Sequence, residues 1–286
     1  MSCRALFAPV ALCLVPTLLL AADEADSSAQ QTHLDDVVVT GSYLLEEETD
    51  MATGLGLSAQ DTPQSVSVIT AQQLRDRDLD TINEVIRYAP GVSTSEIDDV
   101  RNTFFARGFE IRNYQIDGVP LAWSLAGDSG ETIADTSIYQ RIEVVRGATG
   151  LMTGAGDPSA SINLVRKRAD FSEFQGHLNA SYGRWNNRQL MADIGAGLNA
   201  SGSVRGRVVA RIERGEAEMD LYEDDKSVFY GVIEADLGRD TLVRAGASRQ
   251  DNDPTAASWG ALPNWYSDGE RANWPRSTTT AASWSQ

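Results

Sequence analysis

The chain has 286 residues and a formal net charge of −17, from 41 acidic and 24 basic side chains. This sign disfavours nucleic-acid binding, which depends on basic side chains that meet phosphates. Cysteine and histidine are scarce, since the chain holds only Cys3, Cys13, His33 and His177. A thiolate metal site, a disulfide in the mature protein and a histidine-based catalytic triad are therefore all disfavoured.

Residues 1–22 are predicted to be a secretory signal peptide. Arg4 is followed by an apolar run that ends at Leu20, and Ala21-Ala22 precede an acidic stretch. A basic start, a short apolar centre and small residues at the cut are typical of such a peptide. An N-terminal membrane anchor is the alternative, but the run contains two prolines and is shorter than the roughly 20 residues of a spanning helix. We expect export with cleavage near Ala22.

Residues 23–48 are predicted to be a mobile acidic tail, because they are polar and show no hydrophobic periodicity. The tail contains one β-branched run, Asp36-Val37-Val38-Val39-Thr40. An extended segment of this kind can pair through its backbone with the edge of a partner's sheet, which dictates few side chains. An ordinary edge strand is the alternative interpretation.

Residues 49–168 are predicted to form an α+β domain. Its first strand is expected from Ser65 to Ile69. Two capping boxes, Thr70 with Gln73 and Thr81 with Glu84, predict the starts of two helices. The second helix is expected to end at Pro90-Gly91 and to have an apolar face of Ile82, Val85, Ile86 and Ala89.

The later part of this domain is predicted to be a strand, a glycine turn and a returning strand. The apolar runs Ile142 to Val145 and Ile162 to Val165 flank a stretch rich in glycine. No Lys-Ser or Lys-Thr follows the last glycine, so close packing is favoured over a phosphate cradle. Asp117-Gly118 predicts a tight turn, and residues 93–102 and 122–136 are expected to be irregular.

Two short patterns imitate functional sites, and we reject both. Gly127-Asp128-Ser129-Gly130 resembles the nucleophile site of serine proteases, but neither histidine is expected near it. Asp76, Asp78 and Asp80 resemble the start of a calcium loop, but the required glycine and bidentate acid are missing. We therefore expect neither enzymatic activity, nor a resident metal, nor a cofactor.

After Arg168 the pattern changes to strands of alternating polarity. Leu190, Ala192, Ile194, Ala196 and Leu198 alternate with Gln189, Met191, Asp193, Gly195 and Gly197. In the next run Arg205, Arg207, Arg211 and Glu213 alternate with apolar residues. Apolar-out and charged-in alternation is typical of a membrane β-barrel, with a soluble β-sandwich as the alternative. Five strands are expected, with short turns at 199–203 and 238–240 and a long loop from Arg214 to Lys226.

Three stretches together resemble the plug domain of TonB-dependent outer-membrane receptors. They are TPQSVSVIT (62–70), RGFEIRNYQIDGVP (107–120) and RIEVVRGATGLMTGAGDPSASINLVRKR (141–168), in the family's order. The resemblance covers about residues 35–168 and is strongest to the ferric-siderophore branch. It implies an outer-membrane receptor for a ferric chelate, with the run Asp36 to Thr40 as the TonB box that binds the energy-coupling partner TonB.

The resemblance also directs attention to residues that could hold the chelate. Arginine and aromatic side chains suit a large, partly apolar and often anionic ligand, although core packing or the aromatic belt of a membrane protein explains them as well. Arg107 and Arg146 resemble plug arginines that pair with acids on the barrel wall. The ligand candidates are Arg101, Phe104, Phe105, Trp123, Trp259, Trp265, Tyr266 and Trp274.

Receptors of this kind are plugged barrels of about 22 strands, whereas residues 169–286 suffice for about five strands and an outer loop. We therefore expect the chain to be the N-terminal part of a longer receptor. Its domains are then the signal peptide (1–22), the tail (23–48), the plug (49–168) and the first barrel strands (169–286). Another cargo, such as cobalamin, haem or a glycan, and a periplasmic interaction module that does not transport remain the alternatives.

Overall fold

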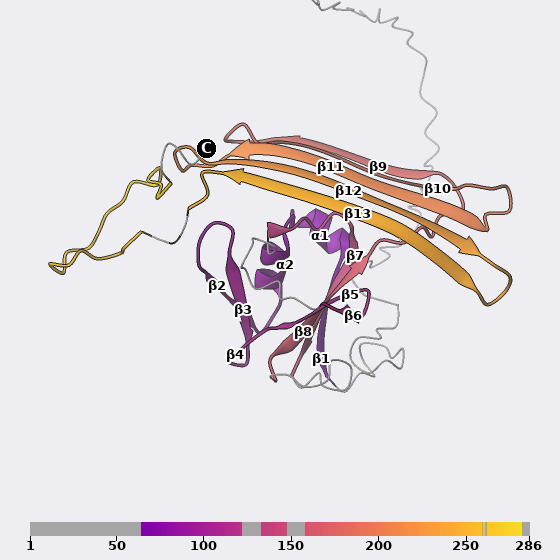
Figure 1. Ribbon diagram of the computed structural model, residues 1–286, viewed down its shortest axis with the longest axis horizontal. Helices are drawn as coiled ribbons and strands as arrows, with labels where there is room; N and C mark the ends of the chain where they lie inside the picture. The colour runs from indigo at the N-terminus through magenta and orange to yellow at the C-terminus, as the bar shows by residue number, and fades with distance from the viewer. Residues whose placement is uncertain (1–63, 122–132, 148–157, 259, 261, 282–286) are drawn as a thin grey trace, which may run out of the picture. The chain divides into compact units, whose positions relative to one another are not determined.

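The computed structural model describes residues 64–121, 133–147, 158–258, 260 and 262–281. The expected signal peptide, the tail and the segment Asp36 to Thr40 lie outside these ranges, as do Trp123 and Trp259. The described residues form a plug portion of two small sheets and two helices, followed by a long five-stranded sheet (Figure 1). None of the described helices has the length and apolar character needed to cross a membrane.

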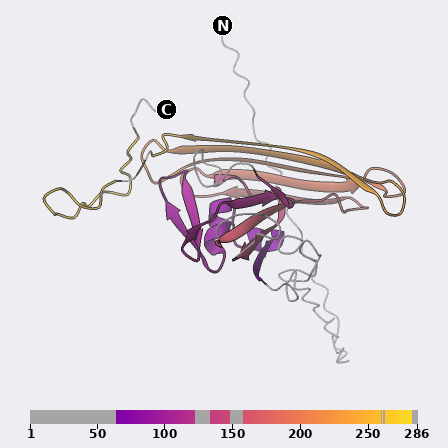
Figure 2. The same ribbon diagram turned by 60° about the horizontal axis from the view of Figure 1, so that its bottom comes forward.

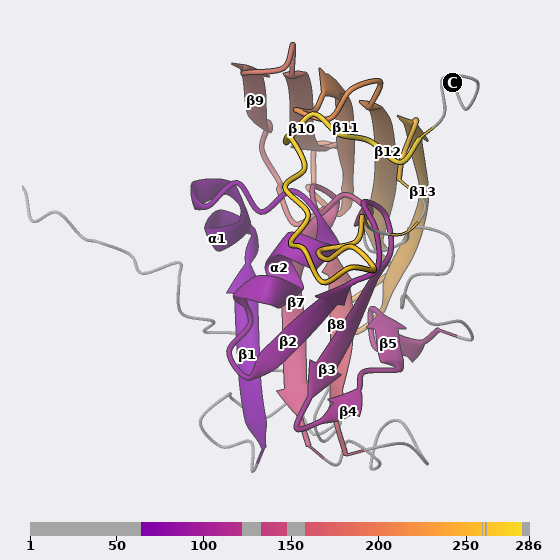
Figure 3. The same cartoon turned by 90° about the vertical axis from the view of Figure 1, so that its left-hand side faces the viewer.

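The main sheet of the plug joins distant parts of the chain. Its strand order is β1-β7-β8-β5-β6, and only the β5–β8 pair is parallel (Figure 3). The strand and the returning strand predicted from the two apolar runs are confirmed by the antiparallel β7–β8 pair, while residues 148–157 of the predicted glycine turn lie outside the described ranges. Asp117 and Gly118 join β5 to β6 with φ values of 51° and 78°, which confirms the tight turn. The strands are β1 (Ser65–Thr70), β5 (Asn113–Ile116), β6 (Val119–Pro120), β7 (Tyr139–Arg146) and β8 (Ala160–Arg166).

Both predicted helices are present, and both predicted capping boxes start them. The Thr70 side chain caps α1 (Ala71–Asp76) and the Thr81 side chain caps α2 (Ile82–Tyr88). In return, the side chains of Gln73 and Glu84 accept from the backbone N–H of the respective cap residue. Each box satisfies backbone N–H groups that a helix start leaves free. The predicted apolar face of α2 is buried in the plug core, with Ile82, Val85, Ile86 and Ala89 at most 2 % exposed.

A second small sheet corrects the expectation that residues 93–102 are irregular. β2 (Val92–Glu96) pairs with β3 (Asn102–Ala106), which also pairs with β4 (Phe109–Glu110). β2 escaped prediction because its VSTSE sequence is polar and largely exposed, so it lacks apolar alternation. Its pairing with β3 supplies the order that its own residues do not indicate.

The five strands predicted after Arg168 are present and form an antiparallel meander in chain order (Figures 2 and 3). The long loop expected from Arg214 to Lys226 is shorter, because the two strands around it extend to Glu216 and from Glu223. Arg214 pairs with Asp225 and Glu213 with Lys226 in this extension. Such polar cross-strand pairs continue a ladder without apolar alternation. The strands are β9 (Gln175–Tyr182), β10 (Arg188–Gly197), β11 (Val204–Glu216), β12 (Glu223–Asp236) and β13 (Leu242–Thr255).

The two faces of this sheet differ, as the alternation predicts. One face exposes apolar side chains, among them Leu178, Leu190, Ile194, Val208 and Ile212. The opposite face is buried and carries Asp193, Arg207, Arg211, Lys226 and Glu234. It also carries a buried apolar group that joins the hydrophobic core of the plug, and of its members sequence reasoning placed only Met191 on this face: Met191, Val209, Val228, Tyr230 and Val232.

Candidate functional site: the contacts between plug and sheet

Arg211 of β11 is the centre of a buried charge cluster that joins the sheet to the plug. Its Nη1 and Nη2 donate to the two carboxylate oxygens of Asp80, each at 2.8 Å. Nη1 also lies 3.0 Å from Oδ2 of Asp135, an ion pair without hydrogen-bond geometry. On the sheet, Nη2 donates to Glu213 at 2.6 Å, and Glu213 lies 3.8 Å from Nζ of Lys226. The planar guanidinium thus neutralises carboxylates from three segments of the chain.

Local structure places the two plug carboxylates together. Asp80 precedes the cap of α2, where its backbone N–H donates to Glu84 of the capping box. Thr81 and Asp135 form an isolated β-bridge, and the Thr136 N–H donates to the Asp80 carbonyl at 3.0 Å. Asp135 is further held to β13, since its N–H donates to Gln250 and its carbonyl accepts from the same amide. The start of α2 is therefore fixed to both β11 and β13.

A second cluster holds the segment where the chain passes from the plug to the sheet. Lys167 and Arg207 share the carboxylate of Asp193, with Nζ 2.7 Å from Oδ2 and Nε 2.7 Å from Oδ1. All three side chains are buried. Burial lowers the pKa of Lys167, against the opposing effect of the Asp193 carboxylate. The cluster is compact enough to compensate charge that would otherwise be costly to bury.

Backbone carbonyls of the same segment accept from the sheet as well. Tyr230 donates to the Lys167 carbonyl at 2.6 Å, Arg207 to the Arg168 carbonyl at 3.0 Å and Arg205 to the Ala169 carbonyl at 3.0 Å. Three consecutive residues are thereby tied to β11 and β12. The end of the plug is consequently fixed, and any movement of the plug has to leave residues 167–169 in place or break this cluster.

The predicted ligand residues of the plug are already engaged in the described structure. Arg101 donates from Nε to Asp98 at 2.7 Å. Phe104 is 0 % exposed and belongs to the plug core, while its neighbour Phe105 points to the other side of β3 and is half-buried. The ring of Phe104 therefore packs the core and is not available at the surface.

Two of the predicted aromatic residues after β13 do come together. Tyr266 and Trp274 meet edge to face, with ring centroids 5.8 Å apart and planes at 62°. Trp274 Nε1 donates to the Pro263 carbonyl at 2.9 Å. Trp265 is the most exposed of the three, at 62 %. This segment extends away from the end of the sheet (Figures 1 and 2). All three rings are exposed, as a binding surface for a large ligand requires.

A cavity of about 450 Å³ opens between the plug and the chain after β13. Its lining includes Asn83, Asp99 and Asn102 of the plug and Met219 and Ser258 beyond it. Asp99 accepts from the Ser258 N–H at 2.7 Å and so closes one side. None of the predicted ligand residues that the structure describes lines this cavity.

Arg107 and Arg146 lie side by side in the plug. Arg146 donates from Nη1 to Ser67 Oγ at 2.8 Å and from Nη2 to Ser65 Oγ at 2.7 Å. A Cβ added at Gly147, whose φ is +111°, would lie 2.8 Å from Nη1 of Arg107. Burial and the charge of Arg107 lower the pKa of Arg146. Within the described residues neither arginine has a carboxylate at ion-pair distance, so pairing with an acid of the barrel wall stays a prediction.

Sequence reasoning missed the two buried charge clusters. Arg211 and Arg207 were placed on the inward face, but no partner was assigned to them. The sequence indicated Asp80 only as part of a calcium-loop pattern that we reject. It indicated Lys167 only as a residue at the end of the glycine-rich motif. The available signal was the presence of three arginines, Arg205, Arg207 and Arg211, on one face of a single strand, because such charges require counter-charges from whatever covers them.

An α+β plug tied by buried ion pairs to one face of an antiparallel sheet, whose other face is apolar, is the arrangement of a plugged membrane barrel. The match of residues 58–161 to the family model described as TonB-dependent Receptor Plug Domain agrees with this class. Residues 58–161 thus belong to the plug domains of TonB-dependent receptors.

Two curated relatives are ferric-pyoverdine receptors. The Ferripyoverdine receptor of Pseudomonas aeruginosa is 44 % identical over 236 residues, which cover 82 % of this chain and 29 % of the relative. The Ferric-pyoverdine 358 receptor of Pseudomonas putida is 40 % identical over 246 residues, which cover 86 % of this chain and 30 % of the relative. The chain thus spans about three tenths of the length of these relatives.

Solved structures show the same similarity. A structure of the FpvAI–pyocin S2 complex superimposes with a TM-score of 0.80 at 42 % identity, covering 86 % of this chain and 33 % of that chain. The ferripyoverdine receptor of the outer membrane of Pseudomonas aeruginosa, bound to ferripyoverdine, superimposes with a TM-score of 0.78 at 42 % identity. That match covers 85 % of this chain and 32 % of the other.

Proposed function

We propose that this chain serves in TonB-dependent uptake of a ferric siderophore across the outer membrane, with a ferric pyoverdine-type chelate as the cargo. The observation that carries the proposal is the plug, fixed by Arg211 and Lys167 to the inward face of a sheet whose outward face is apolar. Two receptors named for ferric pyoverdine are 40 % and 44 % identical to the chain and support this choice of cargo.

In this proposal the plug holds the passage closed until the chelate is bound. The chelate is received at the end of the sheet where β11 turns into β12. The segment that carries Tyr266 and Trp274 begins at the same end. TonB pairs with Asp36 to Thr40 and transmits energy from the inner membrane. Residues 1–22 are removed on export, residues 23–48 carry the coupling segment, and iron is cargo in the chelate with no resident cofactor.

The first and last segments of the plug are held with different strength. A pull from TonB is therefore expected to displace the first segment. Residues 167–169 are tied to the sheet by the Asp193 cluster and three carbonyl hydrogen bonds. β1, which follows the coupling segment in the chain, is an edge strand and pairs with β7 alone in the described sheet. Force applied ahead of β1 therefore meets an edge of the sheet, where strands separate one hydrogen bond after another.

Cargo choice is tested by competition on cells that carry the whole gene from which this chain comes and have no other ferric-pyoverdine receptor. Radioactive ferric pyoverdine is expected to bind and accumulate, and a hundredfold excess of unlabelled ferrioxamine is expected to leave both unchanged. Accumulation of ferrioxamine without accumulation of ferric pyoverdine would replace the proposed cargo. Absence of uptake for every ferric chelate would remove the transport proposal itself.

A further inference from the structure

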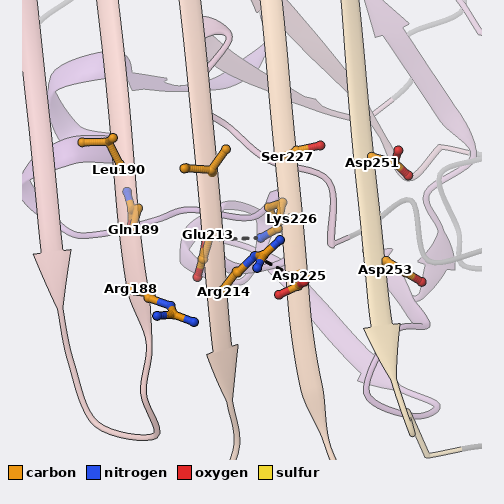
Figure 4. A pocket seen from close by; sticks show the side chains of 11 residues that line it. Arg188, Gln189, Leu190, Glu213, Arg214, Asp225, Lys226, Ser227, Asp251 and Asp253 are labelled. Atoms are coloured by element: carbon orange, nitrogen blue, oxygen red, sulfur yellow. Dashed lines mark ion pairs between the residues drawn. The ribbon is translucent and has the colours of Figure 1, made fainter. Parts of the chain in front are cut away.

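The outward face of the long sheet carries a second site, which lies where the strands pass from apolar to charged residues. A pocket of about 630 Å³ opens there across β10, β11, β12 and β13 (Figure 4). We name it the rim pocket. The outward-facing side chains that define it are Arg188, Leu190, Ile212, Arg214, Asp225 and Ser227.

Two arginines lie next to each other in the rim pocket, although their like charges repel. Arg188 and Arg214 are direct partners in the β10–β11 register, so their side chains leave the same face at neighbouring positions. Like charges directly opposite each other in a sheet are destabilising. An anion placed between the two guanidinium groups converts this repulsion into attraction.

Neither arginine is neutralised strongly by the protein. Within the described chain Arg188 has no carboxylate at ion-pair distance, and Figure 4 shows its side chain extending from β10 toward β11. Arg214 lies 3.4 Å from Asp225, with the two side chains 67 % and 51 % exposed. An ion pair so exposed contributes little. The β10–β11 half of the pocket is therefore basic and open.

The carboxylates of the pocket lie mainly at its other half. Asp251 is paired with Arg249 at 3.0 Å, and Asp253 stands in the Arg188–Arg214 row but on β13. β13 is two strand spacings from β11, or roughly 10 Å, which is about one Debye length at physiological salt. Repulsion of an anion at the arginine pair by these acids is consequently screened.

The surroundings of the arginine pair identify the kind of anion. Leu190 and Ile212 are register partners one outward row away, about 7 Å along the strands, and both are exposed. From that row the outward face continues with Ala192, Ala210 and Phe229 and then Ile194 and Val208. A molecule with a phosphate at one end and hydrocarbon at the other matches this sequence of surfaces.

We propose that the rim pocket binds the phosphate of a membrane-lipid headgroup, with Arg188 and Arg214 donating to the phosphate oxygens and Leu190 and Ile212 contacting the acyl chains. The inference rests on the proposed membrane location, which places the outward face against lipid. It assigns Arg188 and Arg214 to lipid recognition and leaves them without a role in binding the chelate.

The test uses the protein purified from membranes in mild detergent and three probes that separate the parts of the ligand. Phosphatidic acid carries phosphate and chains, diacylglycerol carries the same chains alone, and inorganic phosphate carries no chain. Native mass spectrometry is expected to show phosphatidic acid bound about tenfold more tightly than diacylglycerol, because of the charge-assisted contacts. Inorganic phosphate at equal concentration is expected to displace none of it.

Variants connect this preference to the two arginines. R188Q/R214Q is expected to lower the affinity for phosphatidic acid to that for diacylglycerol, and R188K to lower it by a smaller factor because a single ammonium replaces the planar fork. Arg239→Gln is the matched control, since it removes an equally exposed charge from the turn at the opposite end of the sheet. Its affinity for phosphatidic acid is expected to equal that of the wild type.

Equal affinities for phosphatidic acid and diacylglycerol, or an unchanged double variant, would overturn the inference. Full displacement by inorganic phosphate would make the pocket a free-anion site and overturn its assignment to lipid. Chelate binding, measured on the same preparations, separates this result from the proposed function. Loss of the lipid preference with ferric pyoverdine still bound removes only the rim-pocket inference, whereas lipid preference without chelate binding removes only the proposed transport.

Discussion

Arg211 and Asp80 are 131 residues apart in the chain and form a bidentate ion pair, with both N–O distances at 2.8 Å. The pair joins the inward face of β11 to the residue that precedes the cap of α2. Asp135 and Glu213 form ion pairs with the same guanidinium. Arg211 therefore links three carboxylates where this end of the plug meets the sheet.

Replacing Arg211 by Gln is expected to destabilise the plug against the sheet by about 3–5 kcal/mol, because the buried Asp135, the largely buried Glu213 and the partly exposed Asp80 lose their common cation. Heating in detergent, followed by the protease sensitivity of the plug, measures this loss. Arg249→Gln is the control, since that arginine is exposed and its ion pair with Asp251 contributes little. A melting temperature for R211Q equal to that of R249Q would contradict the role given to Arg211.

The Asp193 cluster predicts an asymmetry between its members. Asp193→Asn leaves Lys167 without a carboxylate partner and Arg207 with only the distant, exposed Asp170 at 3.9 Å, whereas Lys167→Met leaves the Arg207–Asp193 pair neutral and complete. D193N is therefore expected to melt at a lower temperature than K167M. The reverse order, or equal melting, would show that Lys167 and Arg207 do not depend on this carboxylate.

Gly147 is predicted to be required for both its backbone and its space. Alanine there is strained at φ +111° and would also meet the Arg107 guanidinium at 2.8 Å. Gly108 supplies the control, because it has φ +83° and no atom within 4 Å of an added Cβ. We expect G147A to be more destabilising than G108A in chemical denaturation.

The contact of the added Cβ is with Nη1, at the flexible end of the Arg107 side chain, so a double variant is needed to measure its contribution. Adding R107A to G147A should bring its stability to the level that the backbone strain alone sets, about 1–3 kcal/mol below the wild type. If R107A changes nothing in the G147A background, the close approach of the two residues does not matter for stability.

Phe104 and Trp274, two of the aromatic ligand candidates, are predicted to have different roles. Phe104→Ala is expected to cost about 3–5 kcal/mol of plug stability, because the ring is fully buried. Trp274→Ala is expected to leave the melting temperature unchanged and to weaken binding of ferric pyoverdine, since its ring is exposed and meets Tyr266. A W274A protein with wild-type affinity would remove the Tyr266–Trp274 surface from the ligand site.

Local signals carried much of the fold. The capping boxes at Thr70 and Thr81, the Asp117-Gly118 turn and the alternation after Arg168 each depend on residues within a few positions of one another, and each is present in the structure. The meander too was predictable, because neighbouring strands in the chain are neighbours in the sheet.

Contacts across long separations were not predictable in this way. Nothing near Asp80 indicates that Arg211 will meet it, because the pairing depends on how the plug is set against the sheet. Polar strand ends, such as β12 from Glu223 to Ser227, also lack the apolar alternation that marks a strand. For the ligand candidates the sequence shows the chemistry of each side chain but not its burial. It therefore could not separate the buried Phe104 from the exposed aromatic residues.

The most direct measurement of the central proposal compares binding with uptake in cells that carry a deletion of residues 35–41. The run Asp36 to Thr40 is proposed to couple the plug to TonB by strand pairing, so its loss removes the energy supply and leaves the outer surface intact. Val38→Pro, which removes a ladder N–H, is expected to act like the deletion, and Val38→Thr, which keeps it, to act like the wild type.

Cells with the deletion or with V38P are predicted to bind radioactive ferric pyoverdine at the wild-type level in the cold and to accumulate none at growth temperature. Wild-type and V38T cells are predicted to do both. Normal accumulation in the deletion strain would contradict TonB-dependent uptake through this segment.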